Sequence, residues 1–413
     1  MDPMQTTEVT PKSGLRALPR NVWATGFTSF FMDVSSDMVN NILPLFLANV
    51  LGVPAGVIGM IEGVAEATAS LLKMFSGWFS DKLGARKWLA VSGYAVSAIS
   101  KPVFLVANSW GWVAGTRWAD RVGKGIRTAP RDALIADSTP RELHGLAFGL
   151  NRALDNAGAM IGILVAAAII YFNQRGGLEL TRSTFNSVVW ISLVPALLAV
   201  LSLAFGTKDV PVTTQRDAPK IGLHGLGGRF LAFLAIVGLF TLGNSSDGFL
   251  VLRAQNLGLS VTGILLALAL FNLMGAVVAG PAGALSDRVG RRKLILAGWV
   301  VYALIYLGFG LANAAWQIWV LYGLYGVYHG LAFGNATALV ADLVPQEARG
   351  TAYGTYHAAI GLLAFPSSLM AGLLWQWMGP AAPFYAGGIL ALLAAVALAF
   401  FLPLAGQLGE AKA

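Results

Sequence analysis

The stretch GWFSDKLGARK at residues 77–87 recurs as GALSDRVGRRK at residues 283–293, an offset of 206 residues. A second stretch, ADSTPRELHGLAFG at residues 136–149, matches ADLVPQEARGTAYG at residues 341–354, an offset of 205. Two separate motifs at nearly the same offset indicate that a whole half of the chain is repeated, and not one local element.

The composition places these repeats in a membrane. Apolar residues make up 56% of the 413 positions, charged residues only 12%, and the mean hydropathy is +0.67, which excludes a soluble globular protein. The apolar runs are about 20 residues or longer, enough to cross a hydrocarbon core of about 30 Å. Twelve are predicted: 22–47, 56–79, 88–108, 110–135, 144–171, 184–206, 229–254, 260–286, 294–312, 315–341, 351–376 and 380–404. Tandem halves in such a chain are typical of a secondary transporter.

The basic residues predict the orientation. Most of the 28 Lys and Arg lie in the termini and in the loops after even-numbered runs, so the positive-inside rule predicts a protein of the cytoplasmic (inner) membrane with both termini in the cytoplasm. This topology accounts for the net charge of +8, and we expect no nucleic-acid partner. The absence of cysteine excludes disulfides and cysteine metal sites.

The repeated pattern Gly-x-x-x-Asp-(Arg/Lys)-x-Gly-x-(Arg/Lys)-(Arg/Lys) resembles the loop motif of the major facilitator superfamily. The resemblance covers essentially the full chain. It implies an all-α membrane protein with twelve transmembrane helices in two pseudo-symmetric six-helix bundles, working as a monomer. The predicted parts are a cytoplasmic tail (1–21), a first bundle (22–206), a cytoplasmic linker (207–228), a second bundle (229–404) and a C-terminal tail (405–413).

Two further family motifs are matched only in part. Residues 121–125 read RVGKG, with Lys124 where the family often has Gln. Gly158 and Gly162 supply the spacing of a motif associated with drug antiporters, but Ile163 stands where that motif has Pro. This departure weakens an interpretation as a drug antiporter.

The loop motif predicts a gate. Its carboxylates lie at the ends of the second and eighth runs, where the following cations can bridge to neighbouring helix ends, and its glycines allow a tight turn. The alternative is that the basic residues only set topology. The candidate cytoplasmic gate residues are Asp81, Arg86, Asp132, Asp137, Asp287 and Arg291.

Charged residues inside the predicted spans are concentrated in the first half. The basic ones are Lys73, Lys101, Arg117, Arg121, Lys124, Arg127, Arg131 and Arg152, and the acidic ones are Asp33, Asp37, Glu62, Glu66, Asp120, Asp132 and Asp155. Charges at bilayer depth cost several kcal/mol unless paired or hydrated, so they mark a polar pathway. Because the two signs nearly balance, we expect most of these residues to pair with one another.

Helical spacing predicts where the charges lie. Five charged residues of the fourth run recur at intervals of three or four positions and so form a stripe along one face: Arg117, Asp120, Lys124, Arg127 and Arg131. Arg121 and Asp132 lie to the side of this stripe. At about 1.5 Å per residue, Asp33, Glu66, Arg121 and Asp155 meet near the membrane midplane, where such transporters bind substrates and coupling ions. The predicted proton-coupling residues are Asp33, Glu66 and Asp155.

The second half contributes aromatic and polar residues instead, which suit an organic solute with apolar surface. Helix packing is the alternative for these residues. The full list of predicted substrate-binding residues is Asp37, Arg117, Asp120, Arg121, Lys124, Arg127, Asn244, Asp247, Tyr325 and His329. We expect no metal site, since no two histidines stand at ligand spacing on one helix, and no cofactor.

The favoured hypothesis is a proton-coupled transporter that moves a small organic solute by alternating access, in the direction of export. A desolvated carboxylate such as Asp33 can hold a proton and release it when a cation approaches. The alternative is a transporter of an organic anion or metal chelate, in either direction, bound by the basic stripe. A receptor would need an additional soluble domain, and the short tails lead us to expect none. We do not expect an enzyme, since no nucleophile–base set appears. The expected partners are the solute, protons and membrane lipid.

Overall fold

The computed structural model describes residues 14–84, 86–210, 226–289, 291–345 and 348–401, and these residues form helices and no strand. The first half contains η1 (Gly14–Ala17), α1 (Arg20–Asn40), α2 (Leu43–Leu45), η2 (Phe46–Val50), α3 (Ala55–Leu83), α4 (Arg86–Ser100), α5 (Val103–Val106), α6 (Trp110–Ser138), η3 (Arg141–Leu143), α7 (His144–Gln174) and α8 (Arg182–Gly206). The second half contains α9 (Gly227–Gly243), α10 (Gly248–Asn256), α11 (Val261–Val289), α12 (Arg291–Leu311), α13 (Ala315–Leu343), α14 (Arg349–Met378) and α15 (Ala382–Phe401).

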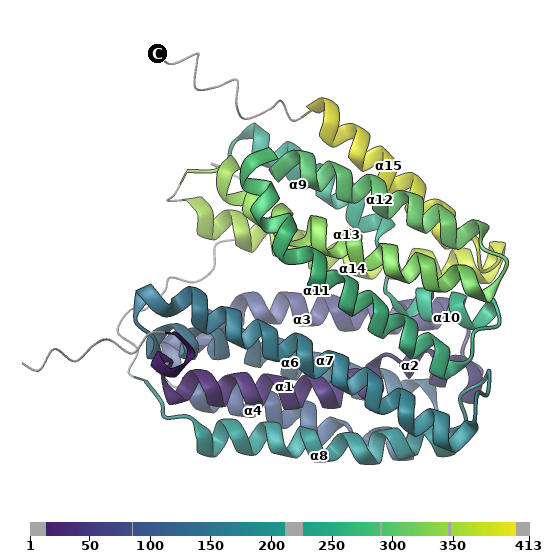
Figure 1. The fold of residues 1–413 in the computed structure, drawn as a ribbon, viewed down its shortest axis with the longest axis horizontal. Helices are drawn as coiled ribbons and strands as arrows, with labels where there is room; N and C mark the ends of the chain where they lie inside the picture. The colour runs from purple at the N-terminus through teal and green to yellow at the C-terminus, as the bar shows by residue number, and fades with distance from the viewer. Residues whose placement is uncertain (1–13, 85, 211–225, 290, 346–347, 402–413) are drawn as a thin grey trace, which may run out of the picture.

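The two halves of the sequence repeat form two bundles that lie side by side (Figure 1). Helices α1 to α8 make one bundle, drawn in purple to teal, and α9 to α15 make the other, drawn in green to yellow. The predicted tails (1–21 and 405–413) and the predicted linker (207–228) lie largely or wholly outside the described residues.

Nine helical stretches in the described part of the chain are long and apolar enough to cross a membrane. Three predicted spans, 22–47, 110–135 and 315–341, are not among them. The charged stripe makes α6 too polar for this test, and α1 carries two aspartates and ends at Asn40. Part of α13 lies outside the described side chains, which shortens the stretch that can be judged. An apolar run therefore identifies a span less well where the span carries charges.

Two predicted spans are broken at prolines. The run 22–47 contains the end of α1 and a new start at α2, whose first turn holds Pro44. The run 88–108 divides between α4 and α5 at Pro102. Proline has no amide N–H and disfavours helical conformation in the residue before it, so each helix ends upstream of the ring.

The run 229–254 is also broken, at Asn244 to Asp247, where the sequence has no proline. Side chains satisfy backbone groups that the break exposes: Ser246 accepts a hydrogen bond from Gly248 N (3.2 Å), and its own N–H donates to Ser368 on α14 (3.2 Å). Non-helical backbone at membrane depth is tolerated only where it is buried in protein or borders a hydrated space.

The helices of the first bundle approach closely at glycines. On α7, a Cβ atom at Gly158 would lie 2.4 Å from the carbonyl oxygen of Phe30, and one at Gly162 would lie 2.4 Å from that of Val34. Both carbonyls belong to α1, so α1 and α7 are in backbone contact along one turn. The glycine spacing noted in the sequence therefore packs two helices together, as small residues do in membrane proteins.

The two bundles contact each other mainly through α3 with α14 and α7 with α11, and also through α2 with α10. We call the end of the molecule where α1 begins the Arg20 end, and the opposite end the Gln255 end. The α3–α14 contact begins at the Gln255 end, where Gly372 faces the backbone of Ala55, and continues to Gly361 beside Ser70. The bundles diverge toward the Arg20 end (Figure 1).

Large apolar side chains cover the outside of the molecule. Phe172, Phe205, Ile99 and Phe400 are all more than 70% exposed. Exposure of this extent is unfavourable in water and indicates that lipid surrounds these helices.

The α1–α7 contact generates the first prediction. Gly162→Val places a side chain against backbone that cannot yield, so we expect it to destabilise the protein by about 1–3 kcal/mol. Thermal unfolding of the purified protein in detergent measures the effect. Gly149→Val is the matched control on the same helix, because a Cβ at Gly149 meets nothing within 4 Å. Equal melting temperatures for the two variants would contradict the packing described here.

Candidate functional site

The charged stripe of α6 is paired with α3 on one side. Arg117 forms an ion pair with Glu62 (2.8 Å), and Arg121 lies 3.7 Å from Glu66. Both arginines and both glutamates are spaced by four residues, so each pair sits one turn along from the other. The Glu62 side chain is 9% exposed and that of Glu66 is 55% exposed. The second pair therefore borders an accessible space while the first is enclosed.

The C-terminal part of the stripe, Arg127 and Arg131, connects α6 to three other helices. Arg127 donates a hydrogen bond to Ser97 of α4, and its guanidinium lies over the Tyr94 ring at 4.6 Å from the centroid. Arg131 contacts Asp132 (2.8 Å), Asp155 of α7 (3.6 Å) and Ser29 of α1 (2.8 Å). These contacts favour a structural role for both arginines.

A buried lysine between α4 and α5 also binds α1. Lys101, at the α4–α5 break, donates hydrogen bonds to Ser35 and to Ser36 (3.2 Å), and its ammonium group lies 3.6 Å from the Met32 sulfur. The sequence analysis placed Lys101 inside a predicted span but assigned no role to it. Its contacts show that hydroxyl groups of α1 bind the ammonium group.

Two carboxylates of α1 are not paired in this way. In the described part of the chain, neither Asp33 nor Asp37 has a cation within 4.0 Å or a side-chain hydrogen bond to its carboxylate. Both are partly exposed. Lys124, which is exposed, is the basic residue whose charge acts on Asp33, Asp37 and Glu66 together.

Of the four residues predicted to meet near the midplane, the structure brings two into contact. Arg121 approaches Glu66, whereas Asp155 contacts Arg131. Asp33 lies within electrostatic range of Asp155 but has no ion pair with a described residue. Asp120 is buried, and the charges of Arg117, Arg121 and Arg127 surround it.

The second half presents one acidic group from the α9–α10 break. The Tyr325 hydroxyl of α13 donates a hydrogen bond to Asp247 Oδ1 (2.8 Å), while Asp247 itself is exposed. Tyr325 stacks on Phe271 of α11 with ring centroids 5.0 Å apart. Asn244 accepts a hydrogen bond from Tyr302 of α12 (3.2 Å).

Behind Tyr325 lies an aromatic cluster that the sequence analysis missed in part. Tyr302 and Tyr306 of α12 stack at 4.1 Å, and both rings approach Tyr325. Their spacing of four residues was the available signal, because it places two tyrosines on one helix face. These rings form a rigid wall behind the exposed carboxylate of Asp247.

Charged and polar groups of the two halves face each other. Lys73 lies within electrostatic range of His357, and Arg152 of His329. Asp247 lies within range of Glu66. Five charged side chains are exposed although they stand in predicted membrane spans: Glu66, Lys73, Lys124, Arg152 and Asp247. Lipid would not solvate them, so they line a hydrated space between the bundles.

At the Arg20 end, three predicted gate residues and Asp342, which was not predicted, form two equivalent ion pairs. Arg86 pairs with Asp137 in the first half, and Arg291 pairs with Asp342 in the second (2.8 Å). The side chains of Asp81 and Asp287 lie outside the described part of the structure. Asp132 contacts Arg131 within its own helix.

In each loop, the residue after the paired arginine donates hydrogen bonds to carbonyl groups at the end of another helix. Lys87 donates a hydrogen bond to the Thr207 carbonyl after α8 (2.9 Å), and Arg292 donates to the carbonyls of Leu398 (3.0 Å) and Ala399 (2.6 Å) in α15. Arg86 and Lys87 therefore correspond to Arg291 and Arg292, at the offset of 205 found for the second motif. The cations satisfy carbonyl groups that a helix end leaves without partners.

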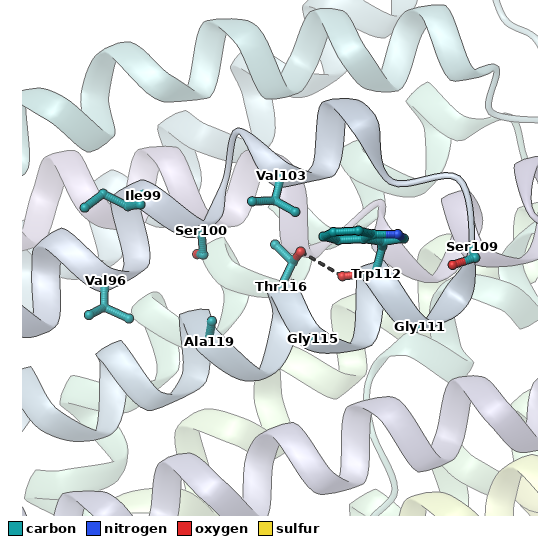
Figure 2. Close-up of a pocket in the computed structure, with 10 residues that line it drawn as sticks. All are labelled: Val96, Ile99, Ser100, Val103, Ser109, Gly111, Trp112, Gly115, Thr116 and Ala119. Carbon is teal, nitrogen blue, oxygen red and sulfur yellow. Dashed lines mark hydrogen bonds between the residues drawn. The ribbon is translucent and has the colours of Figure 1, made fainter.

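A separate cavity of about 670 Å³ lies between α4, α5 and α6, on their outer side. Figure 2 shows its mostly apolar lining, including Val96, Ile99, Val103 and Trp112. Its Thr116 hydroxyl donates to the carbonyl of Trp112 on its own helix (2.8 Å). With no charged lining residue, this cavity belongs to the lipid-facing wall and not to the hydrated space.

Comparison with known proteins agrees with this arrangement. The sequence profile described as "Major Facilitator Superfamily" matches residues 25–252 and 230–412. The chain belongs to the major facilitator superfamily. The two profile matches overlap at residues 230–252 and together cover nearly the whole chain, and the proteins of this superfamily are membrane transporters. The chain is therefore an integral membrane protein of this superfamily.

The relatives and the solved structure described next align with most of this chain. An uncharacterised MFS-type transporter of Methanocaldococcus jannaschii is 34% identical over 93% of this chain and 96% of its own length. A multi-drug resistance efflux pump PmrA homolog of Lactococcus lactis is 33% identical over 86% of this chain and 89% of its own. The crystal structure of a POT family transporter in complex with a thioalcohol-conjugated peptide shares the fold, with a TM-score of 0.79 at 12% identity over 95% and 98% of the two chains.

The paired loops generate the second prediction. Asp137→Asn removes the carboxylate charge from the ion pair with Arg86, whose side chain is 3% exposed, so we expect a loss of about 3 kcal/mol of stability. Asp342→Asn is the matched control, because the side chains of Arg291 and Asp342 are 34% and 46% exposed, and such a pair contributes below about 1 kcal/mol. Melting temperatures in detergent compare them. A larger loss in Asp342→Asn would refute the assignment.

Proposed function

We propose that this protein is a proton-coupled secondary transporter that exports a small organic solute by alternating access. The single observation that carries the proposal is that exposed charged side chains of both halves, Glu66 and Lys124 in the first and Asp247 in the second, stand in predicted membrane spans where only water could solvate them. In this proposal, twelve helices span the inner membrane as two six-helix bundles (22–206 and 229–404), with the linker 207–228 and both termini in the cytoplasm. The protein works as a monomer.

Asp33 is proposed as the proton carrier. A carboxylate that titrates during a cycle must be free of a permanent cation and accessible to water. Asp33 is partly exposed and has no cation within 4.0 Å among the described residues. Glu66 and Asp155 remain alternatives. Each already has an arginine within 4.0 Å, so its charge is balanced within the first bundle in this structure.

The solute is proposed to bind against Asp247 and Tyr325. Oδ1 of Asp247 already accepts the Tyr325 hydroxyl, and the aromatic wall behind it supplies apolar contact. A solute carrying a cationic group fits this surface. Export is supported by the efflux-pump relative, although Ile163 departs from the antiporter motif.

The alternative solute is an organic anion or metal chelate. The four arginines of α6 already contact acidic or hydroxyl partners within the first bundle: Arg117, Arg121, Arg127 and Arg131. Lys124 is the exposed cation that favours this alternative.

The third prediction tests proton coupling. In the wild type we expect solute affinity to rise with pH, because loss of the proton from Asp33 restores a negative charge that attracts a cationic solute. Asp33→Asn should bind with the same affinity at every pH and lose proton-driven accumulation in proteoliposomes. Glu66→Gln should keep the pH dependence. An unaltered pH profile in Asp33→Asn would move the proton role to Glu66 or Asp155.

The fourth prediction separates the two solute classes. The probe is the compound, from a panel of organic cations, organic acids and metal chelates, that most raises the melting temperature of the wild type. Asp247→Asn should weaken its binding by about tenfold or more, since a hydrogen bond to a charged group contributes about 1.5–3 kcal/mol. Lys124→Gln should change affinity far less. The opposite ranking would establish the anion alternative.

A further inference from the structure

A third repeated stretch lies at the Gln255 end. LANVLGV at residues 47–53 corresponds to RAQNLGL at residues 253–259, at the offset of 206. Gly52 and Gly258 occupy equivalent positions with φ of 64° and 86°, a conformation that favours glycine. Each turn leads into the next long helix, α3 or α11. The repeat thus gives both halves the same turn at this end.

Within this repeat, Asn49 and Gln255 are equivalent residues, and they bind each other. Asn49 Nδ2 donates to Gln255 Oε1 (3.2 Å), and Gln255 Nε2 donates to Asn49 Oδ1 (2.8 Å). We call these two residues the amide pair. Because its members come from different halves, the pair joins the two bundles.

Backbone groups fix the orientation of both amides. Leu180 N–H donates to Asn49 Oδ1 (3.1 Å), so this atom must be the oxygen. Gln255 Nε2 donates to the Leu178 carbonyl (2.6 Å), so this atom must be the nitrogen. The loop between α7 and α8 also accepts a hydrogen bond from Val261 N at the Gly177 carbonyl (3.3 Å). The amide pair is therefore the centre of a hydrogen-bonded contact between the halves.

We propose that the amide pair holds the Gln255 end closed and must separate when that end opens, an inference that rests on the alternating access proposed above. Its cross-half bonds cannot survive separation of the bundles. They join neutral, partly exposed groups, which water can solvate after separation, so opening carries no cost of an uncompensated buried charge. The pair therefore acts on the balance between the two states and contributes nothing to solute recognition.

The test uses the absence of cysteine from the chain, which permits site-specific labelling without removing native residues. Spin labels at Ser183→Cys and Asn313→Cys, both exposed and at the Gln255 end of different halves, report their separation by pulsed electron paramagnetic resonance. We expect the wild type to show mainly the short distance. Asn49→Ala and Gln255→Ala should each raise the ratio of long to short distances by on the order of tenfold.

Two further variants separate gating from general damage. The exchange Asn49→Gln with Gln255→Asn keeps two amides at the contact and should restore most of the short distance. Asn173→Ala removes an exposed amide at the same end and should leave the distances unchanged.

The possible outcomes separate a failure of the proposed lock from a failure of alternating access. If the wild type populates both distances and the alanine variants do not change their ratio, the amide pair is not the lock, while alternating access stands. If the exchange variant behaves like the alanine variants, the amide contact is not what closes this end. A single distance in every variant would contradict both the lock and alternating access.

Discussion

Burial of ionised side chains in an apolar bundle is the constraint on which this structure depends. The charged face of α6 has to find partners, because a charge at bilayer depth costs several kcal/mol when unpaired. Glu62 and Glu66 supply them from α3, and Ser97 and Asp155 supply them from α4 and α7. The ion pairs of this one helix thus set much of the packing of the first bundle. Among the described residues of its spans, Asp33 and Asp37 of α1 and Asp120 of α6 are the carboxylates that have no ion pair.

The second bundle packs its helices with few charged side chains. Its buried cation Arg253 binds no carboxylate in the described residues and instead donates to the carbonyls of Phe309 (3.0 Å) and Ala312 (2.8 Å) at the end of α12. Stacked tyrosines of α12 and α13 pack its interior. The two halves share a backbone plan, with equivalent cations at the loops and equivalent turns at the opposite end. Their interiors differ in chemistry, and this difference places charge on one side of the hydrated space and aromatic surface on the other.

The sequence predicted the repeated bundles and the charged stripe well, because both depend on periodicity within a single helix or between the halves. It predicted partners poorly. Arg131 and not Arg121 reaches Asp155, since the choice depends on how α6 and α7 are placed, which spacing along one helix does not determine. The break at Asn244 had no proline to mark it and depends on Ser368 of a distant helix. The tyrosines of α12 became part of the site only through packing against α13.

The amide pair lies where a residue of one repeat meets its own counterpart, which is the position of a pseudo-two-fold axis. At such a position the side chain must be able to pair with an identical copy of itself. A carboxylate would repel its copy and so would an ammonium group, whereas a carboxamide carries both a donor and an acceptor and satisfies its twin. The contact between Asn49 and Gln255 would therefore have worked equally well when both repeats had the same sequence. It is a connection that a duplicated gene could inherit without first having to diverge.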